Sequence, residues 1–176
     1  MISARFQTKT GAITIIQVYA PNIADSETCV DEFYDQLQRE TDKTPKNDIL
    51  IIMGDLNAKV GSDNSGWETV MGKHGHESND RGEKLLTFCA TNDLCITNTM
   101  FKQSKFKRQW TWESPDHKTH NKIDYIMINT KWKRCITNCR SYPSADVGSD
   151  HQMVLSDIKL KFKSKPKCFQ NRKDTR

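Results

Sequence analysis

The stretch 48–57 reads Asp48-Ile49-Leu50-Ile51-Ile52-Met53-Gly54-Asp55-Leu56-Asn57, an unbroken apolar run followed at once by two polar side chains. The run Ile49–Met53 is the longest apolar segment of the chain and predicts a strand buried on both faces. Asp55 and Asn57 are two residues apart, so their side chains would point to the same side of an extended chain. There the carboxylate would orient a water molecule and the amide would donate a hydrogen bond to an oxyanion. An Asx turn that merely closes the strand is the alternative interpretation.

Patterns upstream and downstream of this strand predict further strands and two helices. Residues 13–19 form a β-branched run that predicts a buried strand, preceded by a turn at 9–11 and an edge strand near 4–8. A cap at Asp25 or Ser26 precedes apolar residues at helical spacing, namely Val30, Phe33, Tyr34 and Leu37. Asp80 and Glu83 have the spacing of a capping box and open a second predicted helix.

Four later segments also predict strands: 94–97, 109–112, 122–128 and 153–158, with a turn at 114–116 joining the second to the third. Strands outnumber helices, and the apolar strands suit burial on both faces. We therefore predict an α/β layered domain whose sheets are covered by helices. Catalytic or binding residues are expected on loops at strand ends, where a rigid scaffold positions them.

The composition fits one domain, over residues 1–160, that folds without disulfides. The net charge of +5 is unevenly distributed, because residues 159–176 hold eight basic and one acidic residue while the other 158 hold 19 and 21. We expect a basic tail over 161–176, either a nucleic-acid contact or a solvated linker. No apolar run approaches the ~20 residues of a membrane helix and no signal segment opens the chain, so an intracellular soluble protein is expected.

Asp124 interrupts the apolar segment 122–128 and shares a strand face with Ile126 and Ile128. A carboxylate on an apolar face is costly unless a donor pairs with it, and histidine is the natural candidate. A solvent-end aspartate that is salt-bridged to Lys122 or Arg134 is the alternative.

A second polar cluster reads Gly148-Ser149-Asp150-His151. In extended chain, Asp150 and His151 face opposite ways, so one can meet a metal or water while the other meets a substrate. A turn or helix-cap cluster is the alternative. A serine nucleophile is disfavoured because no Gly-x-Ser-x-Gly elbow surrounds Ser149.

Four motifs occur in the order Val18-Tyr19-Ala20-Pro21-Asn22, Gly54-Asp55-Leu56-Asn57, Lys122-Ile123-Asp124-Tyr125 and Gly148-Ser149-Asp150-His151. In this order they resemble the exonuclease–endonuclease–phosphatase superfamily. Segments 79–83, 92–94, 97–99 and 111–116 resemble the endonuclease domain of LINE-type (non-LTR) retrotransposons and its cellular relatives of the craniofacial development protein 2 type. The resemblance covers about residues 4–162 and implies a DNase I-like α/β (α+β) sandwich of two mixed β-sheets flanked by helices.

The resemblance implies hydrolysis of phosphodiester bonds in DNA, with RNA as an alternative substrate and Mg²⁺ or Mn²⁺ as cofactor. Asp55 would polarise the attacking water and would bind the metal together with Asp150. Asp124 would hold the ring of His151 and stabilise its protonated form. Three side chains would contact the scissile phosphate: Tyr19, Asn57 and His151. These roles suit phosphoryl transfer, which depends chiefly on positioning and charge stabilisation.

In the family pattern, a strand with an Asn and then a Glu that is the principal metal ligand precede the segment corresponding to Ala4–Asn22. The chain begins after both, so we expect a domain without its opening strands, a weakened metal site and an exposed sheet edge. An active endonuclease domain and a catalytically inactive nucleic-acid-binding remnant are both compatible with this pattern. A phosphatase for small phosphoesters is disfavoured by the LINE-like segments.

Residues 101–112 interleave four basic and four aromatic side chains, so cations could meet phosphates while an aromatic ring stacks on a base. We predict Lys107 and Arg108 as phosphate contacts. A hairpin with its aromatics in the core is the alternative, and it is favoured for Trp110 and Trp112. From the resemblance and the basic tail we expect a nuclear monomer, whose longer parent protein would carry a reverse transcriptase domain.

Overall fold

The computed structural model describes residues 1–8, 11–105, 108–143 and 148–160. Five strands form a mixed sheet in the order β1 (Ile2–Gln7), β2 (Ala12–Tyr19), β3 (Ile49–Asp55), β7 (Asp124–Asn129) and β4 (Leu94–Ile96). β2 and β3 are parallel, whereas the other neighbours in this sheet are antiparallel. A second sheet consists of the antiparallel strands β8 (Ile136–Tyr142) and β9 (Met153–Ile158).

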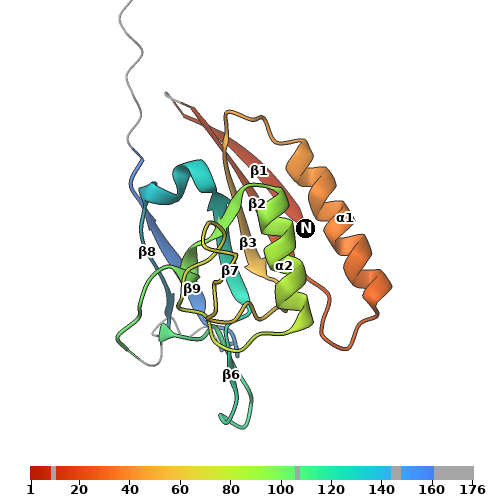
Figure 1. Cartoon of the computed structure of the whole chain (residues 1–176), viewed down its shortest axis with the longest axis vertical. Coiled ribbons are helices and arrows are strands. Elements are labelled where there is room, and N and C mark those ends of the chain that lie inside the picture. The colour runs from red at the N-terminus through yellow and green to blue at the C-terminus, as the bar shows by residue number, and fades with distance from the viewer. Residues whose placement is uncertain (9–10, 106–107, 144–147, 161–176) are drawn as a thin grey trace, which may run out of the picture.

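The remaining elements surround these sheets. α1 (Glu27–Asp42) and α2 (Asp80–Thr91) cover one face of the five-stranded sheet, and β8 and β9 cover part of the other (Figure 1). The short strands β5 (Trp112–Glu113) and β6 (His120–Asn121) form a hairpin at the end of the molecule where β3 finishes (Figure 1). The 3₁₀ helices η1 (Thr97–Thr99) and η3 (Thr130–Cys135) connect strands. This order of layers confirms the predicted α/β sandwich.

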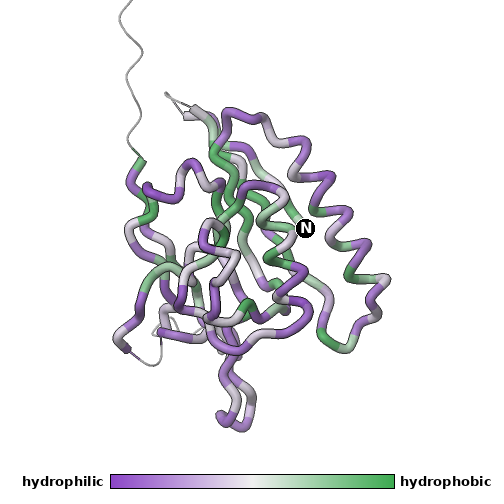
Figure 2. The backbone as a smooth tube through the Cα atoms, viewed as in Figure 1, coloured by the Kyte–Doolittle hydropathy of each residue, from purple (hydrophilic) through white to green (hydrophobic). Residues whose placement is uncertain are grey.

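Alternation along the central strands creates a core on each face of the sheet. Ile52 and Met127 point to the helices, where Leu37 and Leu85 are fully buried beside them. On the opposite face the strands contribute their alternate residues, which pack on the second sheet: Ile49, Ile51, Ile126 and Ile128 meet Ile136 and Cys139. Figure 2 shows the corresponding concentration of hydrophobic residues along the central strands. The predicted burial of β3 on both faces is therefore confirmed.

The second sheet does not cover β1. Ile2 and Phe6 of β1 pair with Gln17 and Ile13 of β2, on the face of the five-stranded sheet that β8 and β9 cover elsewhere. Ile2 is 73% exposed and Phe6 is 53% exposed. β1 is an exposed edge strand, as expected, and part of its apolar face is also exposed.

The predicted helices and most strands are present, with three differences. Ser26 caps α1 as one of the two predicted residues, but α2 is capped by Asn79 and not by Asp80, because the Asn79 side chain accepts the Gly82 N–H. The strand predicted over 109–112 is limited to β5, and the turn near 114–116 leads to its partner β6 and does not join it directly to the strand predicted over 122–128. Strand β8 was not predicted.

No helix in the described ranges is long and apolar enough to cross a membrane. The predicted basic tail, residues 161–176, lies outside the described residues.

Candidate functional site

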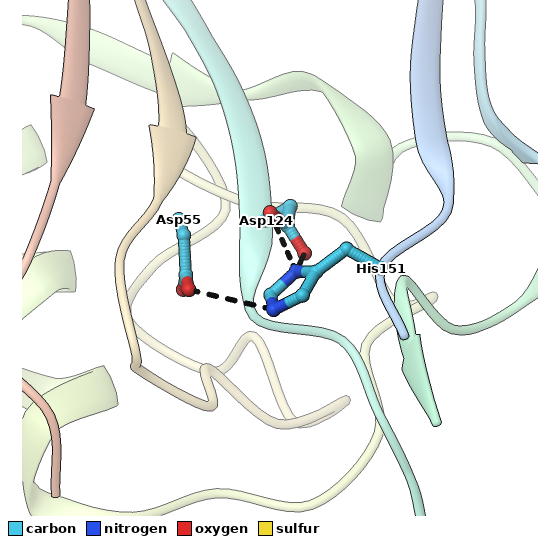
Figure 3. Close-up of side chains that lie close together, drawn as sticks. All are labelled: Asp55, Asp124 and His151. Carbon is cyan, nitrogen blue, oxygen red and sulfur yellow. Dashed lines mark hydrogen bonds and ion pairs between the residues drawn. The ribbon is translucent and has the colours of Figure 1, made fainter. Parts of the chain in front are cut away.

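Three polar side chains from distant parts of the sequence meet at one end of the two sheets. Asp55 is the last residue of β3, Asp124 is the first residue of β7, and the two are directly opposite each other in the register. His151 precedes β9 and faces both carboxylates (Figure 3).

Strand register explains this meeting. Ile49 and Ile51 of β3, and Ile126 and Ile128 of β7, face the second sheet, so Asp55 and Asp124 continue the same face by alternation. β9 belongs to that second sheet, and the residues before it therefore reach the two carboxylates. The chain there is extended, because 150–152 pairs with 111–113 through the Gln152 N–H and the Asp150 carbonyl.

The start of β7 is held firmly in place. The Thr111 hydroxyl oxygen accepts the backbone N–H groups of Ile123 and Asp124, each at 3.1 Å. On the other side the Asn98 amide donates to the Asp124 carbonyl at 2.8 Å. The Asp124 carboxylate is therefore presented from a backbone that is fixed on two sides. Neither Thr111 nor Asn98 was predicted as a supporting residue, although both lie in segments that resemble the retrotransposon endonucleases.

Asp124 pairs with His151, as its place on an apolar face predicts. The distances from His151 Nδ1 to Asp124 Oδ2 and Oδ1 are 3.0 and 3.3 Å. This contact leaves Nε2 directed towards Asp55, whose Oδ2 lies 3.9 Å away (Figure 3). The alternative pairing of Asp124 with Lys122 is wrong, because the Lys122 ammonium donates to the His74 carbonyl.

Asp55 is the most buried member of this group, with only 8% of its side chain exposed. The pKa of its carboxyl is raised from 3.8 to about 6, chiefly by burial and also by the neighbouring charges of Asp124 and Asp150. The Asn57 N–H and His151 oppose this rise. Asp55 therefore titrates close to neutral pH, where both a proton and a cation can compete for it.

Asn57 is placed by a turn and not by extended chain. Its φ of 46° is left-handed, and its backbone N–H donates to Asp55 Oδ1 at 2.9 Å. This is the Asx turn of the alternative interpretation, so the extended geometry expected for Asp55 and Asn57 is wrong. The Asn57 amide nevertheless lines the site, donating to the Ala20 carbonyl at 3.0 Å and lying 3.4 Å from Asn22 Oδ1.

A pocket of about 370 Å³ opens over these groups, and most of the predicted site residues line it: Tyr19, Asp55, Asn57, Asp150 and His151. Tyr19 is opposite Asp55 in the register and is 65% exposed. Asp150 Oδ2 accepts the indole N–H of Trp112 at 2.8 Å. Trp112 thus lies in the site and not in the core, whereas Trp110 is 3% exposed, as the core interpretation predicts.

The donor atoms suit a hard divalent cation. Among the described residues, one group of three possible ligands has its atoms within 4.8 Å of one another: Asp55, Asp124 and His151. Mg²⁺ binds through one or two carboxylates and retains several waters, so few protein ligands suffice. Asp150 was predicted as a ligand with Asp55; it lines the same pocket but does not belong to this group of three.

Of the two predicted nucleic-acid contacts, Arg108 is half-buried, and its backbone N–H donates to the Lys105 carbonyl. Lys107 lies outside the described residues. Further residues that line the pocket were not predicted, among them Asn22, Lys59, Asn79 and Trp112. Asn22, Asn79 and Trp112 lie within segments that carry the family resemblance.

Comparison with known proteins gives sequence relatives that are much longer than this chain. Craniofacial development protein 2 of Bos taurus is 43% identical over 168 residues, covering 95% of this chain and 28% of the relative. The protein of the same name from Tragulus javanicus is 42% identical over 168 residues, covering 95% and 29%. The chain thus spans less than a third of the length of the curated relatives it matches.

Solved structures with the same fold include an endonuclease domain. The endonuclease domain of TRAS1, a telomere-specific non-LTR retrotransposon, has a TM-score of 0.64 at 21% identity, over 90% of this chain and 61% of that chain. The catalytic domain of Xenopus laevis APE2 has a TM-score of 0.62 at 22% identity, over 90% and 53%. These likenesses show the fold.

The match to a family model extends over most of the chain. The model is described as endonuclease-reverse transcriptase and matches residues 13–155, which include all three members of the Asp55, Asp124 and His151 group. With these matches, the chain belongs to the endonuclease/exonuclease/phosphatase family, in its endonuclease–reverse transcriptase branch.

Proposed function

We propose that this domain hydrolyses phosphodiester bonds in DNA with Mg²⁺ or Mn²⁺ as cofactor. The observation that carries the proposal is the alignment of Asp124, His151 and Asp55 beneath an open pocket. A carboxylate that holds one imidazole nitrogen and leaves the other facing a second carboxylate suits proton transfer and charge stabilisation at a phosphate.

Each side chain has a role that follows from its contacts. Asp124 orients the ring of His151, whose Nε2 then contacts a phosphoryl oxygen in the pocket. Asp55, with a pKa of about 6, accepts a hydrogen bond from the attacking water. Asn57 donates to the same phosphate once its longer, 3.4 Å contact with Asn22 gives way. Tyr19 offers its hydroxyl from the exposed rim.

Asp55 and Asp150 would hold the metal ion, since both are oxygen ligands that line the pocket and neither is engaged by His151 Nδ1. When bound, such an ion lowers the pKa of water and neutralises phosphate charge. The indole N–H of Trp112 takes one oxygen of Asp150 and leaves the other available. The donor set therefore fits the cofactor implied by the family.

Nicking of supercoiled plasmid by the purified chain tests this function. We expect nicking with Mg²⁺ or Mn²⁺, none in excess EDTA, and none in His151→Ala. Equal nicking by the wild type and His151→Ala would mean a contaminating nuclease and would refute the proposal. An RNA substrate of the same sequence, assayed in parallel, distinguishes the two nucleic acids.

One observation favours a second candidate function, a nucleic-acid-binding domain without hydrolysis. Asp150 is already bonded to Trp112, and only Asp55 of the two proposed ligands belongs to the group of converging ligand atoms. DNA binding that survives EDTA, together with no nicking at any Mg²⁺ concentration, would select this candidate.

The proposal extends to the longer parent protein. The description of the family model names reverse transcriptase together with endonuclease, so we propose a reverse transcriptase domain in the parent and a nuclear location for a monomeric endonuclease domain. Imaging of the tagged parent protein tests the location, and light scattering of the purified chain tests its mass.

A further inference from the structure

A second pocket, of about 190 Å³, lies on the other side of the segment that borders the candidate site. Asn121 and Ile123 line the first pocket, whereas Lys122 between them lines the second. The described lining of the second pocket contains no carboxylate, and it includes His74 and His76 together with three lysines that carry its positive charge: Lys73, Lys102 and Lys122.

Lys122 forms the buried wall of this pocket and is only 6% exposed. Its ammonium donates to the His74 carbonyl at 2.6 Å and to the Asn98 carbonyl at 3.5 Å, both of which are uncharged. None of the described carboxylates is within ion-pair distance of it. Burial lowers its pKa from 10.5 to about 8. A buried cation without a counter-charge is costly, and a bound anion would offset that cost.

The surroundings indicate where an anion would bind. Lys73 and Lys102 are exposed at the rim, where they can close on a ligand above Lys122. The adjoining pocket, which shares His76, is lined by four carboxylates and would repel the same ligand: Asp63, Glu77, Asp80 and Glu83. A purely structural role, in which Lys122 joins two loops, explains its two carbonyl contacts. It does not explain the lysines at the rim, or why the carboxylates line only the adjoining pocket.

The volume limits what the anion can be. Pockets for drug-sized ligands have volumes of roughly 300–1,000 Å³, so 190 Å³ suits a single phosphate group better than a whole nucleotide. Lysine binds phosphate as a point charge and places little demand on its orientation. A phosphate on a strand that continues past the candidate site fits both the size of the pocket and its position.

We propose that the pocket of Lys73, Lys102 and Lys122 binds a backbone phosphate of the nucleic acid whose scissile phosphate lies at Asp55 and His151. The proposal rests on the proposed function and adds a second contact to it. This contact holds the strand at a fixed distance from the reacting bond and needs no metal ion.

The test uses the double variant Lys73→Gln/Lys102→Gln, because both residues are exposed and their replacement leaves the core intact. The matched control is Lys43→Gln/Lys46→Gln, which removes the same charge from exposed residues at the opposite end of β3. Fluorescence anisotropy of a labelled DNA duplex is measured in EDTA over a series of salt concentrations. Each lost phosphate contact reduces the slope of log K against log salt by about 0.9.

We expect the slope to fall by about 1 in the pocket variant and to stay at the wild-type value in the control. Inorganic phosphate is a second probe, and it should shift the amide signals of Gly75 and Lys122 in the wild type and not in the pocket variant. An unchanged slope in the pocket variant, or equal losses in both variants, would overturn the inference.

The two proposals fail separately. Metal-dependent nicking that requires His151, combined with an unchanged salt slope, would refute the phosphate pocket alone. A reduced slope without any nicking would refute hydrolysis and leave the second contact as part of a nucleic-acid-binding surface.

Discussion

Replacing Asp55 by Asn should make the metal-free protein more stable at neutral pH. Asp55 is 8% exposed, lies near two other carboxylates, and has a pKa of about 6 instead of 3.8. Between pH 4 and 6 the folded protein binds more protons at Asp55 than the unfolded chain does. The free energy of unfolding therefore falls as the pH rises through this window, and above it the full cost of the buried charge is present.

The magnitude follows from the two pKa values. A pKa difference of about 2 corresponds to about 3 kcal/mol, since each pKa unit is worth about 1.4 kcal/mol. The open pocket admits solvent and His151 partly compensates the charge, so we expect a gain of about 1–3 kcal/mol for Asp55→Asn at pH 7. Below pH 4 the gain should vanish, because the wild-type carboxyl is then protonated in both states.

Urea unfolding in EDTA at pH 4, 5, 6, 7 and 8 measures this difference. Asp35→Asn is the matched control, because it makes the same chemical change on the exposed face of α1. A stability profile of Asp55→Asn that is parallel to the wild-type profile would refute the reasoning. A variant that is less stable than the wild type at pH 8 would do so as well.

Three further substitutions test the site and its scaffold. Asp124→Ala removes the acceptor of His151 Nδ1 and should lower the nicking rate by about 10²–10⁴-fold; a wild-type initial rate on plasmid would contradict this. Gly54→Ala should lower the free energy of unfolding in urea by more than about 2 kcal/mol, because φ is 140° and a Cβ would lie 1.9 Å from the Val18 carbonyl oxygen of β2. A decrease of less than about 0.5 kcal/mol would contradict this. Trp112→Phe removes the N–H that holds Asp150 and should raise the Mg²⁺ concentration for half-maximal nicking several-fold. The free energy of unfolding should change by only about 1 kcal/mol. An unaltered Mg²⁺ dependence would contradict the proposal that Trp112 positions Asp150.

The burial of the central strands was predictable, because continuous apolar runs such as those of β3 and β7 are stable only inside a hydrophobic core. β3 and β7 are buried along most of their length, and β2 buries its alternate residues. β8 was not predictable in this way. Its residues Ile136 and Cys139 are buried, but a register shift between Ile136 and Asn138 breaks the alternation that identifies a half-buried strand.

The pairing within the site was partly predictable from the cost of burying charge. A carboxylate at Asp124 on an apolar face needs a donor, and His151 supplies it across 27 positions of sequence. The geometry of Asn57 was not predictable, since an Asn can adopt either extended or left-handed backbone and only the Asx turn decides between them. The burial of Lys122 was also missed, because its carbonyl partners at His74 and Asn98 are brought together only by the fold.

The environment that destabilises Asp55 also makes the site sensitive to both protons and cations. The ligand atoms of Asp55, Asp124 and His151 lie within 4.8 Å of one another. Either a proton on Asp55 or a bound cation relieves the repulsion between the two carboxylates. Protons and Mg²⁺ therefore compete for the same carboxyl, and the Mg²⁺ concentration for half-maximal nicking should rise about tenfold for each pH unit below 6. Nicking rates at limiting Mg²⁺, measured from pH 5 to 8, test this competition. A half-maximal concentration that is constant over that range would show that Asp55 is not a ligand, and the metal would then have to depend on Asp150.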